Sequence, residues 1–223
     1  MFDAIAPRYD LLNRVLSAGL DQRWRRRAVH ALSVGRGARV LDLCTGTADL
    51  AIAIADRHTD ASLVGIDFSG AMLRLGHRKV HALALGRRVR LVRGDAARIP
   101  LANGSCDAAS IAFGIRNIAA PEHALAELQR VLRPGARLVI LEFGQPRVPG
   151  ISTLYSWYFR YLLPFIGRLI SHHRSAYSYL PASVGTFPPP AEFARTIERH
   201  GFVSVSAVPL TLGIVYLYVA TRS

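Results

Sequence analysis

The sequence predicts an α/β protein whose sheet is open, doubly wound and mostly parallel, with an antiparallel hairpin at its C-terminal end. From residue 39 to residue 143, short runs rich in β-branched residues alternate with longer helical segments, the pattern of parallel strands joined by crossover helices. The runs 203–210 and 213–222 are too close for a crossover helix, so we expect them to pair with each other. With 223 residues and 51% hydrophobic content, the chain can bury a full core, and we expect one domain spanning residues 1–223.

Seven runs account for the predicted strands of this sheet. They are residues 39–43, 62–67, 89–95, 107–113, 136–143, 203–210 and 213–222. Helical segments are expected at 48–58, 70–86, 121–135 and 190–201. Pro121 suits the first turn of a helix, and Pro134-Gly135 is expected to close that same helix.

Two segments lie outside this alternation. Residues 1–35 are predicted to form an N-terminal helical lid, because 8–32 has the pattern of helices broken near Gly19. Residues 145–185 are rich in proline and aromatic side chains, and we expect them to form an inserted segment that contacts the substrate.

Composition limits the classes of function. The chain has 28 Lys+Arg against 15 Asp+Glu, and the net charge of +13 favours an anionic partner such as nucleic acid or a phospholipid surface. Lys79 is the only lysine, so the excess is nearly all arginine, and charge alone does not choose between these partners. Cys44 and Cys106 are too few for a disulfide framework, which indicates a reducing compartment. The N-terminus lacks the apolar run of a signal peptide, and the apolar stretch 161–170 is too short to span a bilayer.

The residues that follow the strands are candidates for a ligand site, because open α/β sheets bind ligands at the carboxyl ends of their strands. After the first strand, residues 41–50 form a turn of small residues that leads into a helix, whose free N–H groups can receive an anion. The turn is not G-x-G-x-x-G, which disfavours a dinucleotide-binding oxidoreductase. Asp67 ends the second strand, where its carboxylate can accept hydrogen bonds from a ribose diol or cap the helix that begins near Ser69. Asp95 follows the third strand and can accept from an adenine amino group or serve as a turn residue.

Several segments, taken together, resemble the ubiquinone/menaquinone biosynthesis C-methyltransferase family, within the class I S-adenosylmethionine-dependent methyltransferases. In chain order they read "FDAIAPRYDLLNRVLSAGLDQRWRR", "LDLCTGTADL", "GDAARIPL", "AFGIRNI", "VLRPGARLVILEF" and "SAYSYLPASV". The resemblance covers nearly the whole chain and implies a Rossmann-like sheet of seven strands. It also implies S-adenosyl-L-methionine as cofactor, and a polyprenylated benzoquinol or naphthoquinol that is methylated on a ring carbon.

The resemblance assigns cofactor contacts to residues at the ends of the first three strands. The set is Asp42, Gly46, Thr47, Asp67, Asp95 and Ala96. The glycine-rich turn keeps only Gly46, but its neighbours Cys44 and Ala48 are small, so we expect the cofactor to fit. No metal is expected, because His172-His173 lack further ligands at a suitable spacing.

Catalysis is expected to depend on Arg116 and Asn117, directly after the fourth strand. A ring carbon becomes a good nucleophile when an adjacent hydroxyl is deprotonated, so the enzyme must stabilise a phenolate. Arg116 offers a fixed cation with planar donors, and Asn117 can orient the same oxygen. The alternative for Arg116 is a surface ion pair with Glu122 or Glu142. The third candidate is Tyr9, which we expect to close over the ring.

The expected partners follow from the substrate. A polyprenyl quinol is confined to the bilayer, so we expect a cytoplasmic protein that docks at an anionic membrane through the arginines and aromatic rings of 145–185. The same segment could instead cover the sheet or form a homodimer interface. Another S-adenosylmethionine-dependent activity, on RNA or a different small molecule, is the alternative function. We expect no nucleic acid, because base methylation usually places Asn/Asp-Pro-Pro-aromatic where this chain has "FGIRN".

Overall fold

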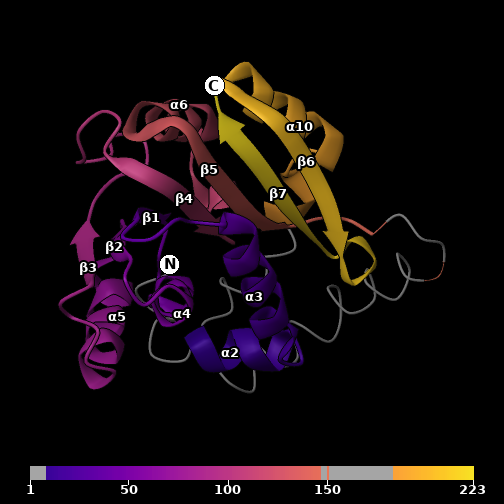
Figure 1. The fold of residues 1–223 in the computed structure, drawn as a ribbon. Helices are drawn as coiled ribbons and strands as arrows, with labels where there is room; N and C mark the ends of the chain where they lie inside the picture. The colour runs from indigo at the N-terminus through magenta and orange to yellow at the C-terminus, as the bar shows by residue number, and fades with distance from the viewer. Residues whose placement is uncertain (1–8, 147–149, 151–182) are drawn as a thin grey trace.

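In the described part of the chain, seven strands form one sheet. The computed structural model describes residues 9–146, 150 and 183–223 and is drawn as a ribbon in Figure 1. The strand order is β3-β2-β1-β4-β5-β7-β6. The strands are β1 (Arg39–Leu43), β2 (Ser62–Asp67), β3 (Val89–Arg93), β4 (Cys106–Ala112), β5 (Leu132–Phe143), β6 (Phe202–Leu210) and β7 (Val215–Arg222). Strands β1 to β5 pair in parallel, whereas β7 is antiparallel to both β5 and β6, which confirms the predicted fold class.

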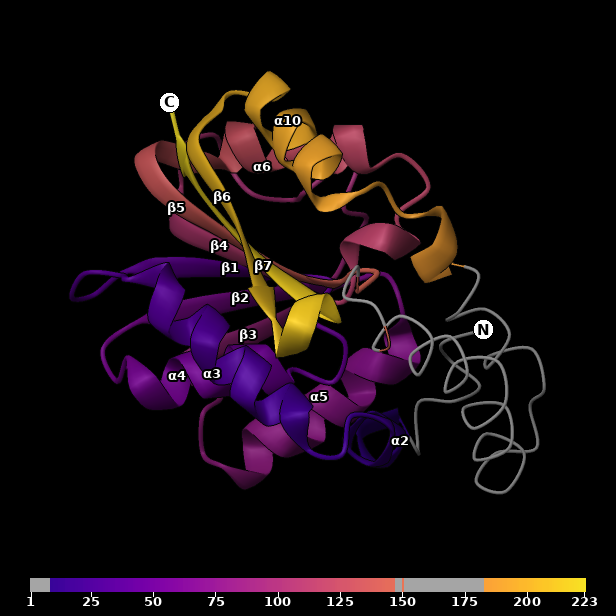
Figure 2. The same cartoon turned by 90° about the vertical axis from the view of Figure 1, so that its right-hand side faces the viewer.

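Helices cover both faces of the sheet (Figure 2). One face carries α3 (Leu20–Leu32), α4 (Asp49–Arg57) and α5 (Gly70–Ala82), and the other carries α6 (Pro121–Val131) and α10 (Pro190–Arg199). Two separate clusters of buried side chains fill the spaces between sheet and helices, and Trp24 and Leu50 belong to the first, Leu125 and Phe193 to the second. The sheet is therefore the middle of three layers in the described part of the chain.

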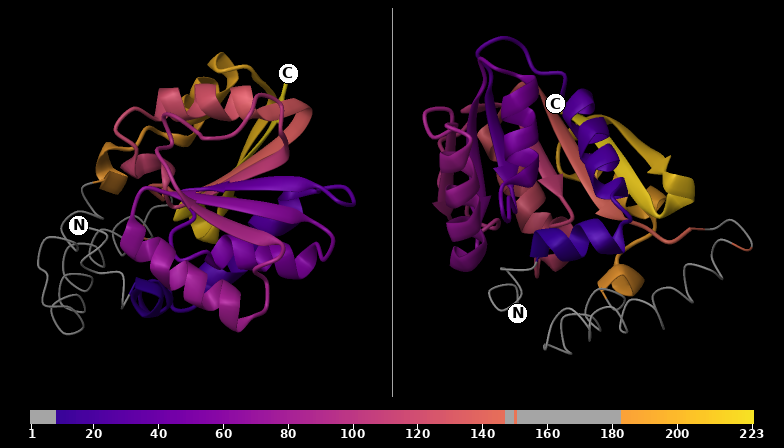
Figure 3. Two further views of the ribbon diagram at one scale, coloured as in Figure 1. Left: turned by 90° about the vertical axis from the view of Figure 1, so that its left-hand side faces the viewer. Right: turned by 90° about the horizontal axis from the view of Figure 1, so that it is seen from below.

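The N-terminal helices break where the sequence predicted. Helix α2 (Tyr9–Leu16) stops three residues before Gly19, which has a φ of 76° and directly precedes α3. Trp24 of α3 is buried, and its indole Nε1 donates to Thr211 Oγ1 at 2.8 Å. Because α3 is held in this way, α2 lies at the side of the molecule where the parallel strands end (Figure 3, right).

The junction between α6 and β5 differs from the prediction. The helix was expected to run to Gly135 and the strand to begin at residue 136, but α6 ends at Val131 and β5 begins at Leu132. Arg133 precedes a proline, and steric contact with the proline ring disfavours helical dihedral angles at that position. Leu132 instead pairs with Cys106, and the register then shifts before Ala108.

Two predicted segments are only partly covered by the structure. Most of 145–185, all of 1–8 and the side chain of Tyr9 lie outside the described residues, so the lid and the inserted segment stay predictions. Among the residues that are described, no helix combines the length and the apolar character needed to span a membrane.

Candidate cofactor and active site

A cavity of about 420 Å³ opens at the carboxyl ends of β1, β2, β3 and β4. Each of these strands contributes residues at its last position or in the loop that follows it, among them Gly46, Asp67, Asp95 and Asn117. This volume lies within the range of small-molecule and cofactor sites, and the location is the edge where open parallel sheets bind ligands.

The turn after β1 forms one wall of the cavity in an unusual backbone conformation. Cys44, Gly46 and Ala48 have φ values of 57°, 58° and 67°, in the left-handed region that normally costs a non-glycine residue about 1–2 kcal/mol. Gly114, at the exit of β4, packs against this turn so closely that a Cβ there would lie 2.3 Å from the Cβ of Cys44. Burial also raises the pKa of the Cys44 thiol, which keeps it protonated at neutral pH.

Asp67 connects the first turn to the second strand. Its Oδ2 accepts from the backbone N–H of Gly46 at 2.8 Å, and its Oδ1 accepts from that of Ser69 at 2.8 Å. The cap of α5 is Ser69, whose hydroxyl accepts from Met72 N, so Asp67 supports this helix start without being its cap. Asp67 also lines the cavity, so its carboxylate lies where a ligand hydroxyl can reach it.

Asp95 and Ala96 line the cavity beyond β3. The Oδ1 of Asp95 accepts from Ala97 N at 2.9 Å, a local turn of the kind that was the alternative reading of this residue. The turn and a ligand contact are compatible, since the local bond leaves further acceptor positions on the carboxylate.

Arg116 lies in the short helix η2 (Ile115–Asn117) and forms a buried ion pair. Its Nη1 donates to Glu142 Oε1 at 2.5 Å and to the carbonyl oxygen of Phe113 at 2.8 Å. Its Nε lies 3.4 Å from Ser183 Oγ, and its guanidinium sits 5.1 Å from the ring centre of Phe143. The side chain of Arg116 is 8% exposed and that of Glu142 fully buried, so the pair lies inside the protein and not on the surface.

Of the two predicted catalytic residues after β4, Arg116 and Asn117, it is Asn117 that lines the cavity. Its Nδ2 donates to the carbonyl oxygen of Phe113 at 3.2 Å, the same oxygen that accepts from Arg116. Phe113 itself has a φ of 58° where the chain leaves β4. Arg116 and Asn117 are therefore held against one strained carbonyl group at the end of the strand.

Comparison with known proteins assigns the chain to a family. The profile of the ubiE/COQ5 methyltransferase family matches residues 1–222. The chain belongs to the ubiE/COQ5 methyltransferase family. The ubiquinone/menaquinone biosynthesis C-methyltransferase UbiE of Syntrophotalea carbinolica is 49% identical over 223 residues, which cover 100% of this chain and 93% of that protein. The demethylmenaquinone methyltransferase of Thermus thermophilus is 48% identical, with 100% of both chains covered.

Solved structures of methyltransferases share the fold of this family member. An S-adenosylmethionine-dependent methyltransferase from Aquifex aeolicus superimposes with a TM-score of 0.60 at 19% identity, covering 89% of this chain and 88% of that one. The geranyl diphosphate C-methyltransferase of Streptomyces coelicolor gives 0.68 at 16% identity, covering 92% and 80%. The protein is thus an S-adenosylmethionine-dependent methyltransferase with the predicted class I fold.

Two predicted cofactor residues of this methyltransferase lie behind the cavity wall. Thr47 is 3% exposed, and its hydroxyl donates to Asp10 Oδ1 at 2.6 Å. Asp42 is 1% exposed and accepts from the hydroxyls of Thr45 and Ser110 at 2.6 and 2.7 Å. Burial raises the pKa of Asp42 to about 6, although the two hydroxyl hydrogen bonds act in the opposite direction. Neither residue lines the cavity, so each can act on the cofactor only through the turn it supports.

The sequence analysis missed Phe68 and the environment of Asp10. Phe68 lines the cavity with a 71% exposed ring, and the guanidinium of Arg93 sits 5.8 Å from its centre. Its position directly after the strand-ending Asp67 was the signal that could have found it. The carboxylate of Asp10 accepts hydrogen bonds from Thr47 and Lys79, which lie far from it in the sequence.

The chain's own groups fit S-adenosyl-L-methionine. Asp67 and Asp95 place carboxylates at neighbouring strand ends, and Phe68 adds an exposed aromatic ring to the same cavity lining. At Gly46, which also lines the cavity, the space where a Cβ would lie is empty. A nucleoside with a diol, an amino group and a flat base meets matching groups in this arrangement.

Proposed function

We propose that this protein methylates a ring carbon of a polyprenylated quinol, converting demethylmenaquinol to menaquinol or performing the corresponding benzoquinol step of ubiquinone biosynthesis. The names of the relatives that match the full chain, a ubiquinone/menaquinone biosynthesis C-methyltransferase and a demethylmenaquinone methyltransferase, support this acceptor class. The observation that carries the proposal is the joint placement of Asp67, Asp95 and Asn117 on one cavity wall. Two groups suited to a nucleoside and one suited to a ring oxygen then face the same space.

The proposed cofactor-binding roles follow from the place of each group in the cavity lining. Asp67 accepts from the ribose hydroxyls, and Asp95 accepts from the adenine amino group beside Ala96. Gly46 lets the cofactor come close to the backbone of the first turn, because glycine has no Cβ and the space where one would lie is empty. Asp42 and Thr47 hold that turn in place from behind.

The methyl acceptor is positioned by the residues after β4. S-adenosyl-L-methionine supplies a methyl group that its sulfonium makes electrophilic. The carbonyl of Phe113 fixes Asn117, which orients the ring oxygen at the cavity wall. Glu142 fixes the guanidinium of Arg116, whose Nη2 has no acceptor among residues 9–146 and 183–223. Arg116 is not part of the cavity lining, so its donation to the same oxygen requires the acceptor ring to reach past Asn117. Because Glu142 offsets much of the charge of Arg116, we assign the phenolate stabilisation to directed hydrogen bonds more than to net charge. Tyr9, the first residue of α2, is the third group proposed to face the acceptor ring.

The test is transfer of a radiolabelled methyl group from S-adenosyl-L-methionine to reduced demethylmenaquinone and, separately, to the reduced benzoquinone precursor. Purified full-length protein should label at least one of the two quinols and leave the oxidised quinones unlabelled, since only the quinol can form a phenolate. Failure to label either quinol, by protein that binds the cofactor, would overturn the proposed acceptor class.

Arg116→Lys is the matching test of the catalytic assignment. Lysine keeps the charge but loses the planar donors, so kcat should fall steeply while the Kd for the cofactor stays near that of the wild type. Normal turnover of quinol by the lysine variant would remove Arg116 from the catalytic set.

We also propose that the protein works at an anionic membrane surface. Support comes from the net charge of +13 and from Arg23, Arg26 and Arg27, which are exposed on α3. Co-sedimentation with vesicles of anionic lipid should exceed that with neutral vesicles and should decrease with salt. Equal sedimentation with both lipids would contradict the proposal.

A further inference from the structure

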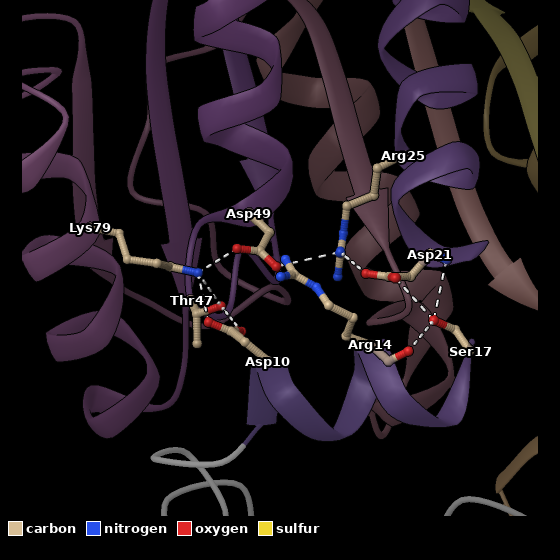
Figure 4. Close-up of polar contacts among 8 residues, drawn as sticks. All are labelled: Asp10, Arg14, Ser17, Asp21, Arg25, Thr47, Asp49 and Lys79. Atoms are coloured by element: carbon tan, nitrogen blue, oxygen red, sulfur yellow. Dashed lines mark hydrogen bonds and ion pairs between the residues drawn. The ribbon is translucent and has the colours of Figure 1, made fainter. Parts of the chain in front are cut away.

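Lys79 occupies a position that suits an ammonium group and no other cation. It is the only lysine among 28 Lys+Arg residues, and it extends from α5 toward the first turn (Figure 4). Its Nζ donates to Asp10 Oδ2 at 2.8 Å, to Thr47 Oγ1 at 3.0 Å and to Asp49 Oδ1. Three acceptors converge on one nitrogen, which matches the three donors of an ammonium and not the planar fork of a guanidinium.

These acceptors come from separate segments of the chain. Asp10 belongs to α2, Thr47 to the turn after β1 and Asp49 to the start of α4. The Thr47 hydroxyl also donates to Asp10 Oδ1, so Lys79, Asp10 and Thr47 form a closed ring of hydrogen bonds. We call these four residues, Lys79 with Asp10, Thr47 and Asp49, the ammonium clamp.

A second cation extends the clamp to α3. The Nη1 of Arg25 lies 3.4 Å from the Oδ2 of Asp49 and 2.5 Å from the Oδ2 of Asp21. Asp21 in turn accepts from the hydroxyl of Ser17 at 2.9 Å, between α2 and α3 (Figure 4). Both ends of α2 are thus connected by polar contacts to the core of the domain.

Helix α2 buries none of the side chains that the structure describes for it. None of its side chains at positions 10, 11 and 13–16 is buried, and Leu11 and Val15 are 57% and 45% exposed. A helix of eight residues is not stable alone in water, so its order must come from contacts with the rest of the protein. Among the contacts of the described residues, we therefore take the polar contacts of the ammonium clamp to be a main contribution to the order of α2.

The clamp is one residue away from the cofactor cavity. Thr47 follows Gly46, which lines the cavity and whose N–H is bound by Asp67. The clamp and the cavity thus share one turn, so a ligand that orders this turn lowers the entropy lost when α2 docks on it. By thermodynamic linkage, docked α2 then favours the ligand to the same degree.

We propose that Lys79 is a positioning residue that couples the order of helix α2 to occupation of the cofactor cavity. It does not touch the reacting atoms, and it acts through Thr47 and Asp10. The inference uses the cofactor site and does not depend on the identity of the methyl acceptor, so it can fail or hold independently of the quinol proposal.

The experiment measures hydrogen exchange in peptides that cover residues 9–16, with and without saturating S-adenosylhomocysteine, together with the affinity for that ligand by calorimetry. In the wild type, the ligand should slow exchange in α2 even though α2 is outside the cavity wall. In Lys79→Met, exchange in α2 should be faster without ligand, the ligand should no longer slow it, and affinity should fall by about 5-fold or more. Lys79→Arg should recover only part of this loss.

Two further variants separate coupling from general destabilisation. Arg133→Met breaks an ion pair with Asp107 at the amino-terminal ends of β5 and β4, away from the cavity at the carboxyl ends, and it should leave both α2 exchange and ligand affinity as in the wild type. Asp10→Ala removes a partly exposed clamp residue, should reproduce the effects of Lys79→Met, and carries the test if Lys79→Met does not fold. The proposal is overturned if ligand still protects α2 in the folded clamp variant, or if the Arg133 variant loses the protection equally.

Discussion

Asp42→Asn is expected to make the protein more stable at neutral pH, because the native carboxyl group is buried at a cost. Asp42 is 1% exposed, and burial raises its pKa from 3.8 to about 6. Between these two pH values the folded protein holds this proton and the unfolded chain releases it, so the free energy of unfolding decreases as pH rises through the window. At 1.36 kcal/mol per pH unit, the loss is about 3 kcal/mol above pH 6.

Asparagine removes the titration and keeps the shape of the side chain. Its carbonyl oxygen can accept from one of the two hydroxyls now bound to Asp42, those of Thr45 and Ser110, and its amide can donate to the other. Loss of charge assistance in these two bonds offsets part of the gain, so we expect a net stabilisation of about 1–3 kcal/mol at pH 7.

Urea unfolding of both proteins at pH 4, 5, 6 and 7 gives the measurement. The stability of the variant minus that of the wild type should be smallest at pH 4 and increase up to about pH 6, then level off. Taking this difference cancels other titrating groups, such as Glu127, whose pKa is lowered by its hydrogen bond with Arg130. A difference that stays constant from pH 4 to pH 7 would refute the reasoning.

Three further predictions concern the cavity and the groups beneath it. Asp67→Ala should weaken binding of S-adenosylhomocysteine by roughly 1.5–3 kcal/mol in calorimetry, the range for charge-assisted hydrogen bonds, and unchanged affinity in folded protein would exclude the contact. Arg116→Met should destabilise the fold by about 3–5 kcal/mol in urea unfolding, because it leaves the buried carboxylate of Glu142 without its cation, and the added change Glu142→Gln should recover much of that loss. Gly114→Ala should lower the thermal midpoint through about 1–3 kcal/mol of overpacking against the Cβ of Cys44, and Cys44→Gly in the same chain should restore it; no rescue would mean that the two positions are not in contact.

The sheet could be predicted because each strand carries its signal locally. The alternation of strand and helix patterns fixes which segments are parallel, and the short separation of β6 and β7 fixes the hairpin. The same logic found Asp67 and Asp95, because a polar residue at the end of a parallel strand lies at the ligand edge whatever its neighbours are.

Contacts between distant segments could not be predicted in the same way. Glu142 was one of two candidate partners for Arg116. That this ion pair is buried could not be known from the sequence, since it depends on the pairing of β4 with β5, which brings the two residues together. The ammonium clamp joins Asp10 to Lys79 across 69 positions, and no local pattern marks either residue. Helix α6 ended early because of Arg133, where the constraint of the following proline outweighs helical periodicity.

The contact between Trp24 and Thr211 has a consequence for the order in which the protein can be completed during synthesis. Helix α3 leaves the ribosome early, yet it packs on β5 and β7, and its indole is bonded to the loop between β6 and β7. A nascent chain that lacks its last strands can form the contacts of α3 with α4, β4 and β5, but not those with β7 and Thr211. Helix α3, which carries the Arg25 link to Asp49, therefore gains its last contacts only when the C-terminal hairpin is released.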